Sequence, residues 1–141
     1  MRKKNIILEW DDEIAQDSVV WGIVSSAGYL KLVHFINKTG FFDFTRKDNI
    51  EYSVGETKSS FICYSYNDNE TETYYKLVVN RGDNGIIDKK LKNIDMILSI
   101  NSESNETIEA AYAILNNNNM IETVFEIDLT KQSHKAIDII I

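Results

Sequence analysis

Few residues of this chain have the type and spacing that chemistry would require. Cys63 is the only thiol, and His34 and His134 are the only imidazoles. A nucleophilic cysteine needs a base within hydrogen-bond reach and a third group that orients the base, and no spacing joins either histidine to Cys63. These residues also lack the paired spacing of a zinc site. The sequence therefore predicts no catalytic residue and no metal site, and Cys63 is expected to be a small core residue.

Asp95 is the one carboxylate in an otherwise apolar run, residues 94–100. A buried charge is costly unless it is paired or hydrogen-bonded. One interpretation makes Asp95 a functional acid or a ligand contact with a shifted pKa. The other, which we favour, places it near the start of a strand, where backbone donors or a lysine of the preceding connector hold it.

Other motif matches are weak, and no cofactor is expected. No glycine-rich phosphate-binding pattern occurs in the chain. Acidic residues at 11–17 and 67–72 could attract a cation, but they lack EF-hand spacing. Arg81-Gly82-Asp83 matches the integrin tripeptide, yet its setting among Gly, Asn and Asp predicts a turn between strands.

The C-terminus carries four isoleucines, namely Ile137, Ile139, Ile140 and Ile141. If they were exposed, they would form an aggregation-prone patch. We expect them to pack on their own domain, to pair along a sheet edge, or to meet a second subunit. Residues 129–141 are accordingly predicted to be a tail or an edge strand.

Composition predicts an ordinary globular chain. With 141 residues, 43% apolar and 26% charged, we expect one domain over 1–141. The net charge of -7 disfavours nucleic-acid binding, and no apolar run approaches the roughly 20 residues that span a bilayer. A single cysteine permits no internal disulfide, which fits a reducing compartment. We therefore expect a cytoplasmic protein with no nucleic-acid or membrane partner.

Periodicity predicts the first half of the chain as follows. Residues 5–10 alternate as a strand, and 17–24 are expected to be a loop or a short extended piece. A helix is predicted from Ser25 or Ser26 to Thr39, with an apolar stripe of Tyr29, Leu32, Val33 and Ile36 and with Gly40 as the left-handed residue that ends it. A strand at 41–46 and a polar loop at 47–58 are expected to follow.

The second half of the chain has clearer patterns. Residues 59–80 predict a hairpin that turns at 67–70, and 94–100 predict a central strand covered on both faces, with Ile94 on the same face as Met96. A helix capped within 101–105 is predicted from the stripe Ile108, Ala111, Tyr112 and Leu115. Residues 120–128 predict a last strand, with Ile121, Phe125 and Ile127 on one face.

This element order predicts an α+β fold, a two-layer sandwich. A mostly antiparallel sheet would carry two helices mainly on one face, in a split βαβ-like plan with an added hairpin.

Four segments together resemble the IPExxVDY family of small bacterial proteins from Bacteroidetes: LVHFINKTG, FICYSYNDNETETYYKLVVN, NIDMILSI and VFEID. The resemblance covers most of the chain in order and spacing. Ile94-Asp95-Met96 stands where the family has Val-Asp-Tyr, and the connector DKKLKN has no counterpart of its Pro and Glu. Only Asp95 matches the name-giving motif. The family has no established activity, so the resemblance implies a bacterial protein and no particular chemistry.

The expected function is that of a non-enzymatic cytoplasmic protein-interaction or regulatory domain. It would form a homodimer or bind a protein partner through a sheet edge or through the isoleucine-rich C-terminus. The alternative is a sensor domain that binds a small metabolite, because α+β sandwiches can hold ligands between sheet and helices.

Overall fold

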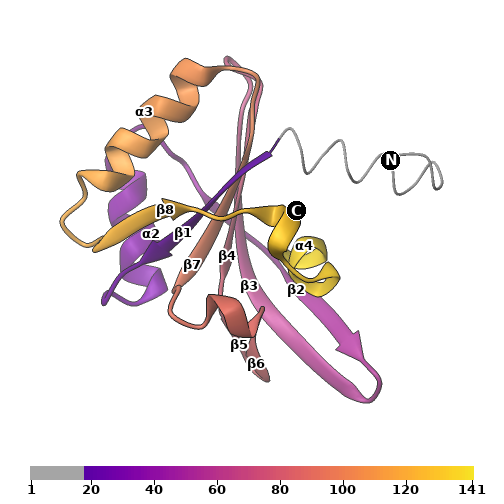
Figure 1. The fold of residues 1–141 in the computed structure, drawn as a ribbon. Coiled ribbons are helices and arrows are strands. Elements are labelled where there is room, and N and C mark those ends of the chain that lie inside the picture. Colours follow the sequence, from indigo (N-terminus) through magenta and orange to yellow (C-terminus); the bar gives the residue numbers. More distant parts are fainter. Residues whose placement is uncertain (1–17) are drawn as a thin grey trace, which may run out of the picture.

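The computed structural model describes residues 18–141, apart from the Val54 side chain, and contains a six-stranded sheet with helices on both faces (Figure 1). Its strand order is β2-β3-β4-β7-β1-β8, and each neighbouring pair is antiparallel. The strands are β1 (Ser18–Val24), β2 (Thr45–Val54), β3 (Thr57–Asp68), β4 (Thr73–Val79), β7 (Met96–Asn101) and β8 (Thr123–Glu126). A separate two-stranded ribbon pairs β5 (Arg81–Gly82) with β6 (Gly85–Ile86).

Helices α2 (Tyr29–Lys38) and α3 (Asn105–Asn116) cover one face of the sheet, which we call the first face. Helix α4 (His134–Ile140) covers part of the other, the second face (Figure 1). Short 3-10 turns, η1 (Lys89–Leu91) and η2 (Leu129–Lys131), lie on the second face as well. The predicted α+β sandwich with a mostly antiparallel sheet is confirmed, and α4 adds a third helix that the periodicity had not indicated.

Strand β7 is central, as predicted, because it pairs with β4 on one side and β1 on the other. Met96, Leu98 and Ile100 enter the first-face core, whereas Ile97 enters the second-face core. Ile94 was expected beside Met96, and this is wrong. It precedes the strand and belongs to the second-face core, because alternation holds only within extended backbone.

The helices of the first face use most of the predicted stripes, although Tyr112 of α3 is 38% exposed. In α2, Leu32, Val33 and Ile36 are buried, and Gly40 has the left-handed φ of 82° that ends such a helix. The helix begins later than expected, after Gly28. In α3, the Ser104 hydroxyl accepts a hydrogen bond from the Thr107 amide at 3.2 Å and caps the first turn.

The strand predicted at 41–46 is wrong for residues 41–44, which are not in a strand, and only Thr45 and Arg46 belong to one, as the start of β2. Phe42 and Phe44 are nevertheless buried in the first-face core. The reason that residues 41–44 are not in a strand is the Asn37 side chain. Its amide donates to the Phe44 carbonyl at 3.0 Å, and its oxygen accepts from the Phe44 amide at 2.8 Å. The backbone of Phe44 is thus paired with a helix side chain and has no free groups for a strand ladder.

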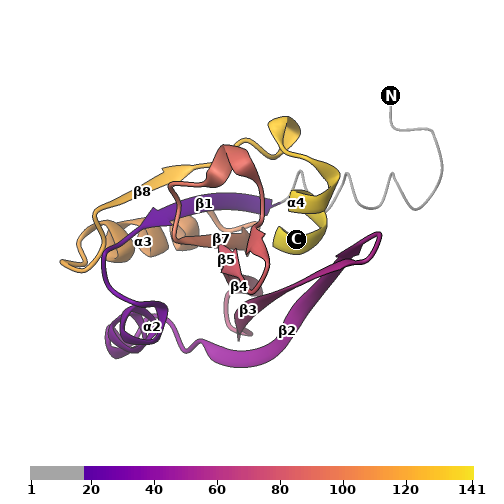
Figure 2. The same cartoon turned by 90° about the horizontal axis from the view of Figure 1, so that it is seen from below.

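The loop predicted at 47–58 is wrong too, because β2 and β3 form a hairpin through those residues. Gly55, with a φ of 61°, lies in the two-residue turn between Val54 and Thr57. Strand β2 is polar because it is an edge strand with mostly exposed residues. Figure 2 shows it curving away from α2 toward α4, which it contacts.

Residues 17–24 were expected to be a loop or a short extended piece, whereas 18–24 form β1, which lies between β7 and β8. Its alternation is hidden because both faces are covered. Val20 points to the second face, and Trp21 and Ile23 belong to the first.

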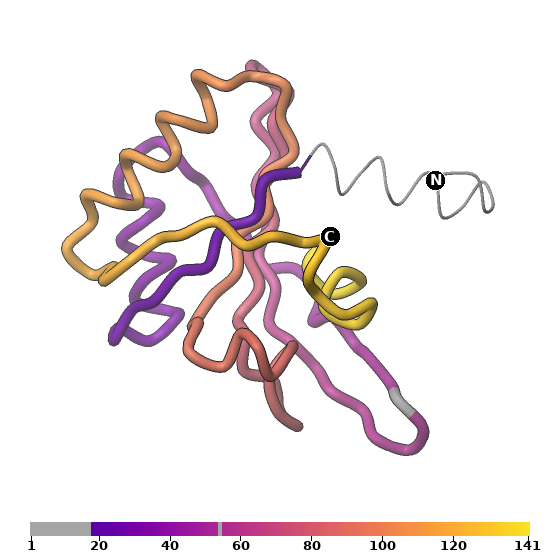
Figure 3. The backbone as a smooth tube through the Cα atoms, viewed as in Figure 1, coloured from indigo at the N-terminus to yellow at the C-terminus, as the bar shows by residue number. Residues whose placement is uncertain are grey.

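The C-terminal segment, predicted as a tail or an edge strand, crosses from β8 to α4 (Figure 3). Ser133 caps α4 by accepting from the Ala136 amide at 3.1 Å. Ile139 and Ile140 are buried in the second-face core, while Ile137 and Ile141 are half-buried against it. The isoleucines therefore pack on their own chain as a helix, and residues 134–140 are not an edge strand.

Strand β8 is shorter than the predicted 120–128, and this corrects its faces. Ile121 belongs to the first-face core and Ile127 to the second. Phe125 is 41% exposed and lies over Gly22, so the three predicted residues do not share one face.

The strand predicted at 5–10 lies outside the described residues. Within residues 18–141, none of the helices is both long enough and apolar enough to cross a membrane.

Candidate functional site

The second face of the sheet has an apolar half and a polar half. The apolar half is made by Val20, Phe61, Cys63, Val78 and Ile97, which α4 and the segments around η1 and η2 cover. The polar half carries the side chains that continue the same alternation further along each strand. We call this half the polar shelf, and its members are Ser18, Ser65, Asn67, Tyr74, Lys76, Ser99 and Asn101.

Strand register aligns the polar shelf into two rows. In the first row Lys76 of β4 lies opposite Ser65 of β3 and opposite Ser99 of β7. Because neighbouring strands lie roughly 4.8 Å apart, two hydroxyl-bearing residues flank the lysine at close range. In the second row Tyr74 lies between Asn67 and Asn101 in the same way.

The polar shelf lines a pocket of about 260 Å³. Its remaining walls are Cys63, Tyr75 and Ile141, the last at the end of α4. Ser99 is only 7% exposed, and Ser65 and Lys76 beside it are half-buried. A sheet face that simply met water would expose such side chains, so this part of the face is a recess. Its size suits a small molecule rather than a large cofactor.

Among the described residues that line this pocket, Lys76 has the only charged side chain. It is half-buried, and burial lowers its pKa below the ordinary lysine value. Among residues 18–141, Cys63 is the only group that acts against this shift of the Lys76 pKa, and no carboxylate does so. The Lys76 ammonium is therefore partly desolvated without a carboxylate from residues 18–141 to compensate it.

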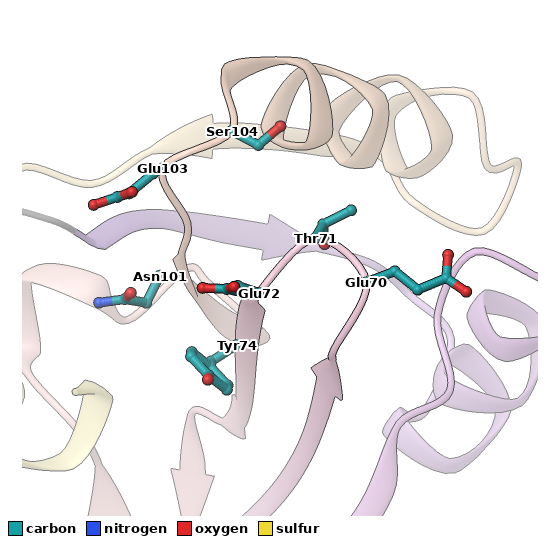
Figure 4. A pocket seen from close by; sticks show the side chains of 7 residues that line it. All are labelled: Glu70, Thr71, Glu72, Tyr74, Asn101, Glu103 and Ser104. Carbon is teal, nitrogen blue, oxygen red and sulfur yellow. The ribbon is translucent and has the colours of Figure 1, made fainter.

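A second hollow, of about 540 Å³, adjoins the pocket and shares Tyr74 and Asn101 with it (Figure 4). It contains three exposed glutamates, Glu70, Glu72 and Glu103. Figure 4 shows Glu72 and Glu103 pointing to one side and Glu70 pointing away from them. Within residues 18–141, no group of His, Cys, Asp or Glu has metal-binding geometry, and we assign no ligand to this hollow.

Asp95 fits the structural interpretation. Its carboxylate accepts from the Ser25 amide at 2.8 Å. Its own amide donates to the Ile23 carbonyl at 2.9 Å, and its carbonyl accepts from the Asn80 amide at 3.0 Å. Asp95 thus joins the ends of β1 and β4 to the start of β7. It also lines a small hollow of about 120 Å³ with Arg81.

The structure does not bring Cys63 together with a histidine pair. His34 is exposed on α2, on the first face, while Cys63 is buried on the second. Burial raises the pKa of the Cys63 thiol, and Lys76 only partly opposes this. A protonated, buried thiol is a poor nucleophile.

Arg81-Gly82-Asp83 is a turn region, as expected. Arg81 and Gly82 form β5, and the Asp83 carboxylate accepts from the Ser60 amide at 2.8 Å. A Cβ on Gly82 would lie 2.6 Å from the Ser60 carbonyl oxygen. The tripeptide is therefore packed against β3 and is not presented as a free loop.

Lys76 and the serines beside it are the residues that sequence reasoning missed. The available signal was a change from apolar to polar at alternate positions, after Cys63 in β3 and after Ile97 in β7. Each change from apolar to polar residues by itself only indicates that the strand extends beyond the apolar core. The strand register decides that these positions lie side by side.

Comparison with known proteins does not assign this chain to a family. No protein-family model matches the chain, and no curated protein matches it. The resemblance to the IPExxVDY family therefore stays a prediction.

Proposed function

We propose that this chain is a non-enzymatic sensor or regulatory domain that binds a small ligand in the pocket of the polar shelf. The observation that supports the proposal is the row Ser65, Lys76 and Ser99, which forms the floor of a recess that α4 leaves open. Lys76 is half-buried and has no carboxylate partner among residues 18–141, so in the described part of the chain nothing offsets the cost of its burial. A ligand that pairs with Lys76 would compensate the cost of burying it.

The pocket also has the general character of a ligand site. It places several hydrogen-bonding groups together, with the aromatic ring of Tyr74 and the aliphatic side chain of Ile141 at its border. A few convergent polar groups within a concave surface are typical of small-molecule sites. No nucleophile with an adjacent base is present among the described pocket residues, and we therefore propose binding without bond chemistry.

A thermal-shift screen tests the proposal. The library should hold neutral, cationic and anionic metabolites, and a ligand at a hundredfold excess over its Kd should stabilise the fold by roughly 2.7 kcal/mol. The variant Ser65→Phe fills the pocket and should abolish the shift. Thr57→Phe is the matched control, because it changes the same strand far from the pocket. A shift that survives Ser65→Phe would contradict binding at this pocket.

A second candidate function is a protein-interaction domain that pairs through the outer edge of β2. The observation in its favour is that β2 is a ten-residue edge strand whose outer side has no neighbour in the described sheet. A register shift between Lys47 and Ile50 interrupts its first half, so pairing would use residues 50–54. Light scattering over a wide concentration range tests self-association, and a monomer at every concentration would contradict it.

A further inference from the structure

We infer that the pocket of the polar shelf selects a ligand with an anionic head group, a carboxylate or a phosphate, held by Lys76 together with Ser65 and Ser99. This inference rests on the proposed function and adds the chemical class of the ligand to it.

The charge distribution supports an anion. The chain as a whole carries a net charge of -7, and yet among residues 18–141 the only charged side chain that lines this pocket is a cation. The glutamates of the adjoining hollow are exposed to solvent and lie beyond Tyr74 and Asn101. Solvent screens them, whereas the charge of half-buried Lys76 is screened less. Lys76 therefore attracts an anion inside the pocket more strongly than the screened glutamates repel it. Elsewhere on the surface, the negative net charge repels an anion.

The donors match the shape of an oxyanion. A carboxylate or a phosphate presents two or three oxygens that accept hydrogen bonds from several directions. Lys76 supplies an ammonium, and Ser65 and Ser99 supply hydroxyls from the strands on either side of it. Ser99 is 7% exposed, so its hydroxyl is already largely withdrawn from water. A charge-assisted hydrogen bond in such a setting is stronger than one at a free surface.

The second row of the polar shelf fits the rest of the molecule. Asn67 and Asn101 lie two residues further along their strands, roughly 7 Å from the first row. The Tyr74 ring between them is 51% exposed and offers an aromatic surface. A ligand whose anionic group lies on Lys76 would therefore place a flat or polar body on this row.

Matched pairs of simple probes test the anion preference. Benzoate and phenyl phosphate carry the charge, and benzamide and benzyl alcohol are their uncharged counterparts. NMR chemical-shift titration of the full chain suits the weak binding of such fragments. Both anions should bind with shifts centred on Lys76, Ser65 and Ser99, and the uncharged probes should bind at least about tenfold more weakly. Added salt should weaken anion binding.

Substitutions of Lys76 test whether this lysine causes the preference for anions. Lys76→Met keeps the length of the side chain and should lower anion affinity by about tenfold to hundredfold. Lys76→Arg keeps the charge and should retain most of the binding. Lys31→Met, on exposed α2, is the matched control and should bind like the unaltered protein. Circular dichroism verifies that each variant is folded.

The outcomes separate this inference from the proposed function. If benzamide binds as tightly as benzoate, or if Lys76→Met binds the anions as well as Lys31→Met does, the anion inference is wrong. If the metabolite screen yields only neutral or cationic ligands that Ser65→Phe abolishes, the pocket still binds a ligand and only the anion class fails. If no compound of any class binds, both proposals fail.

Discussion

In the sequence Asp95 looks functional and Lys76 does not, whereas in the structure Asp95 has a structural role and Lys76 lines the pocket. Asp95 attracts notice as a carboxylate in an apolar run, but its oxygen accepts a backbone hydrogen bond from Ser25. Lys76 attracts no notice within a tyrosine-rich strand, but it is the charged residue of the pocket. The reason is that chemistry depends on what a side chain faces, and sequence alone does not show that.

The structural role of Asp95 predicts the effect of removing its carboxylate. Asp95→Ala should lower the free energy of unfolding by about 1.5–3 kcal/mol, because a hydrogen bond to a charged group is lost and the Ser25 amide has no replacement. Urea unfolding measures this loss. Asp43→Ala, at an exposed site, is the control and should have little effect. Equal stability of both variants would contradict the structural role.

The Tyr75 hydroxyl predicts a stabilising substitution. It is buried without a hydrogen-bond partner among the described residues, inside a cluster with Phe42, Phe44 and Tyr66. Tyr75→Phe removes the unpaired hydroxyl and keeps the ring, so the free energy of unfolding should rise by about 1 kcal/mol. Thermal unfolding measures it. Tyr74→Phe is the control, because Tyr74 is half-exposed and its substitution should change little.

Tyr75 also predicts how stability changes in alkali. Burial raises its pKa from 10.0 to about 12. The unfolded chain therefore loses this proton first, so the stability from neutral Tyr75 is complete below pH 10.0 and is lost as the pH rises toward about 12. Tyr75→Phe should fall less steeply over that interval than the unaltered protein in denaturant titrations at each pH. Parallel curves for the two proteins would contradict the shift.

At the level of secondary structure, α4 determines what the C-terminal isoleucines do. They were candidates for an interaction surface, and instead they close the apolar half of the second face. The helix has only seven residues, which is too short to be stable alone. Its stability therefore comes from the contact between its apolar side and the sheet.

This contact predicts unequal effects along the helix. Ile139 is fully buried, so Ile139→Ala should cost about 2–5 kcal/mol of unfolding free energy. Ile137 is half-buried, and Ile137→Ala should cost clearly less. Urea denaturation measures both, and light scattering follows the molecular mass. If a substitution changed the molecular mass in solution but not the free energy of unfolding, these isoleucines would serve self-association and not packing within the chain.

Across the whole molecule, the two faces of the sheet are covered differently by residues 18–141. The first-face core is continuous from α2 to α3, whereas the second-face core ends where the polar shelf begins. A recessed part of the sheet that the elements of residues 18–141 leave open allows a ligand to enter without opening the core. Stability and binding can therefore be altered separately.

Lys76→Met tests this separation in the absence of any ligand. Burial disfavours the charged form of Lys76 in the folded state, and a methionine removes that cost while keeping the aliphatic contacts. At neutral pH the variant should be at least as stable as the unaltered protein by urea denaturation. A clear loss of stability would mean that Lys76 serves the fold and would weaken the proposed ligand site.

The sequence by itself determined the elements whose signals are local. The helix stripes, Gly40, the hairpin of β3 and β4 and the central strand β7 follow from periodicity and turn chemistry, and they sufficed for the α+β class. Only the tertiary structure decided the rest. The Asn37 side chain forms hydrogen bonds with the backbone of Phe44, so that this backbone does not pair in a strand. Pairing with β3 makes a polar segment the strand β2. The row Ser65, Lys76 and Ser99 exists because three strands align in one register. Such effects join residues far apart in the chain, and no local pattern encodes the alignment.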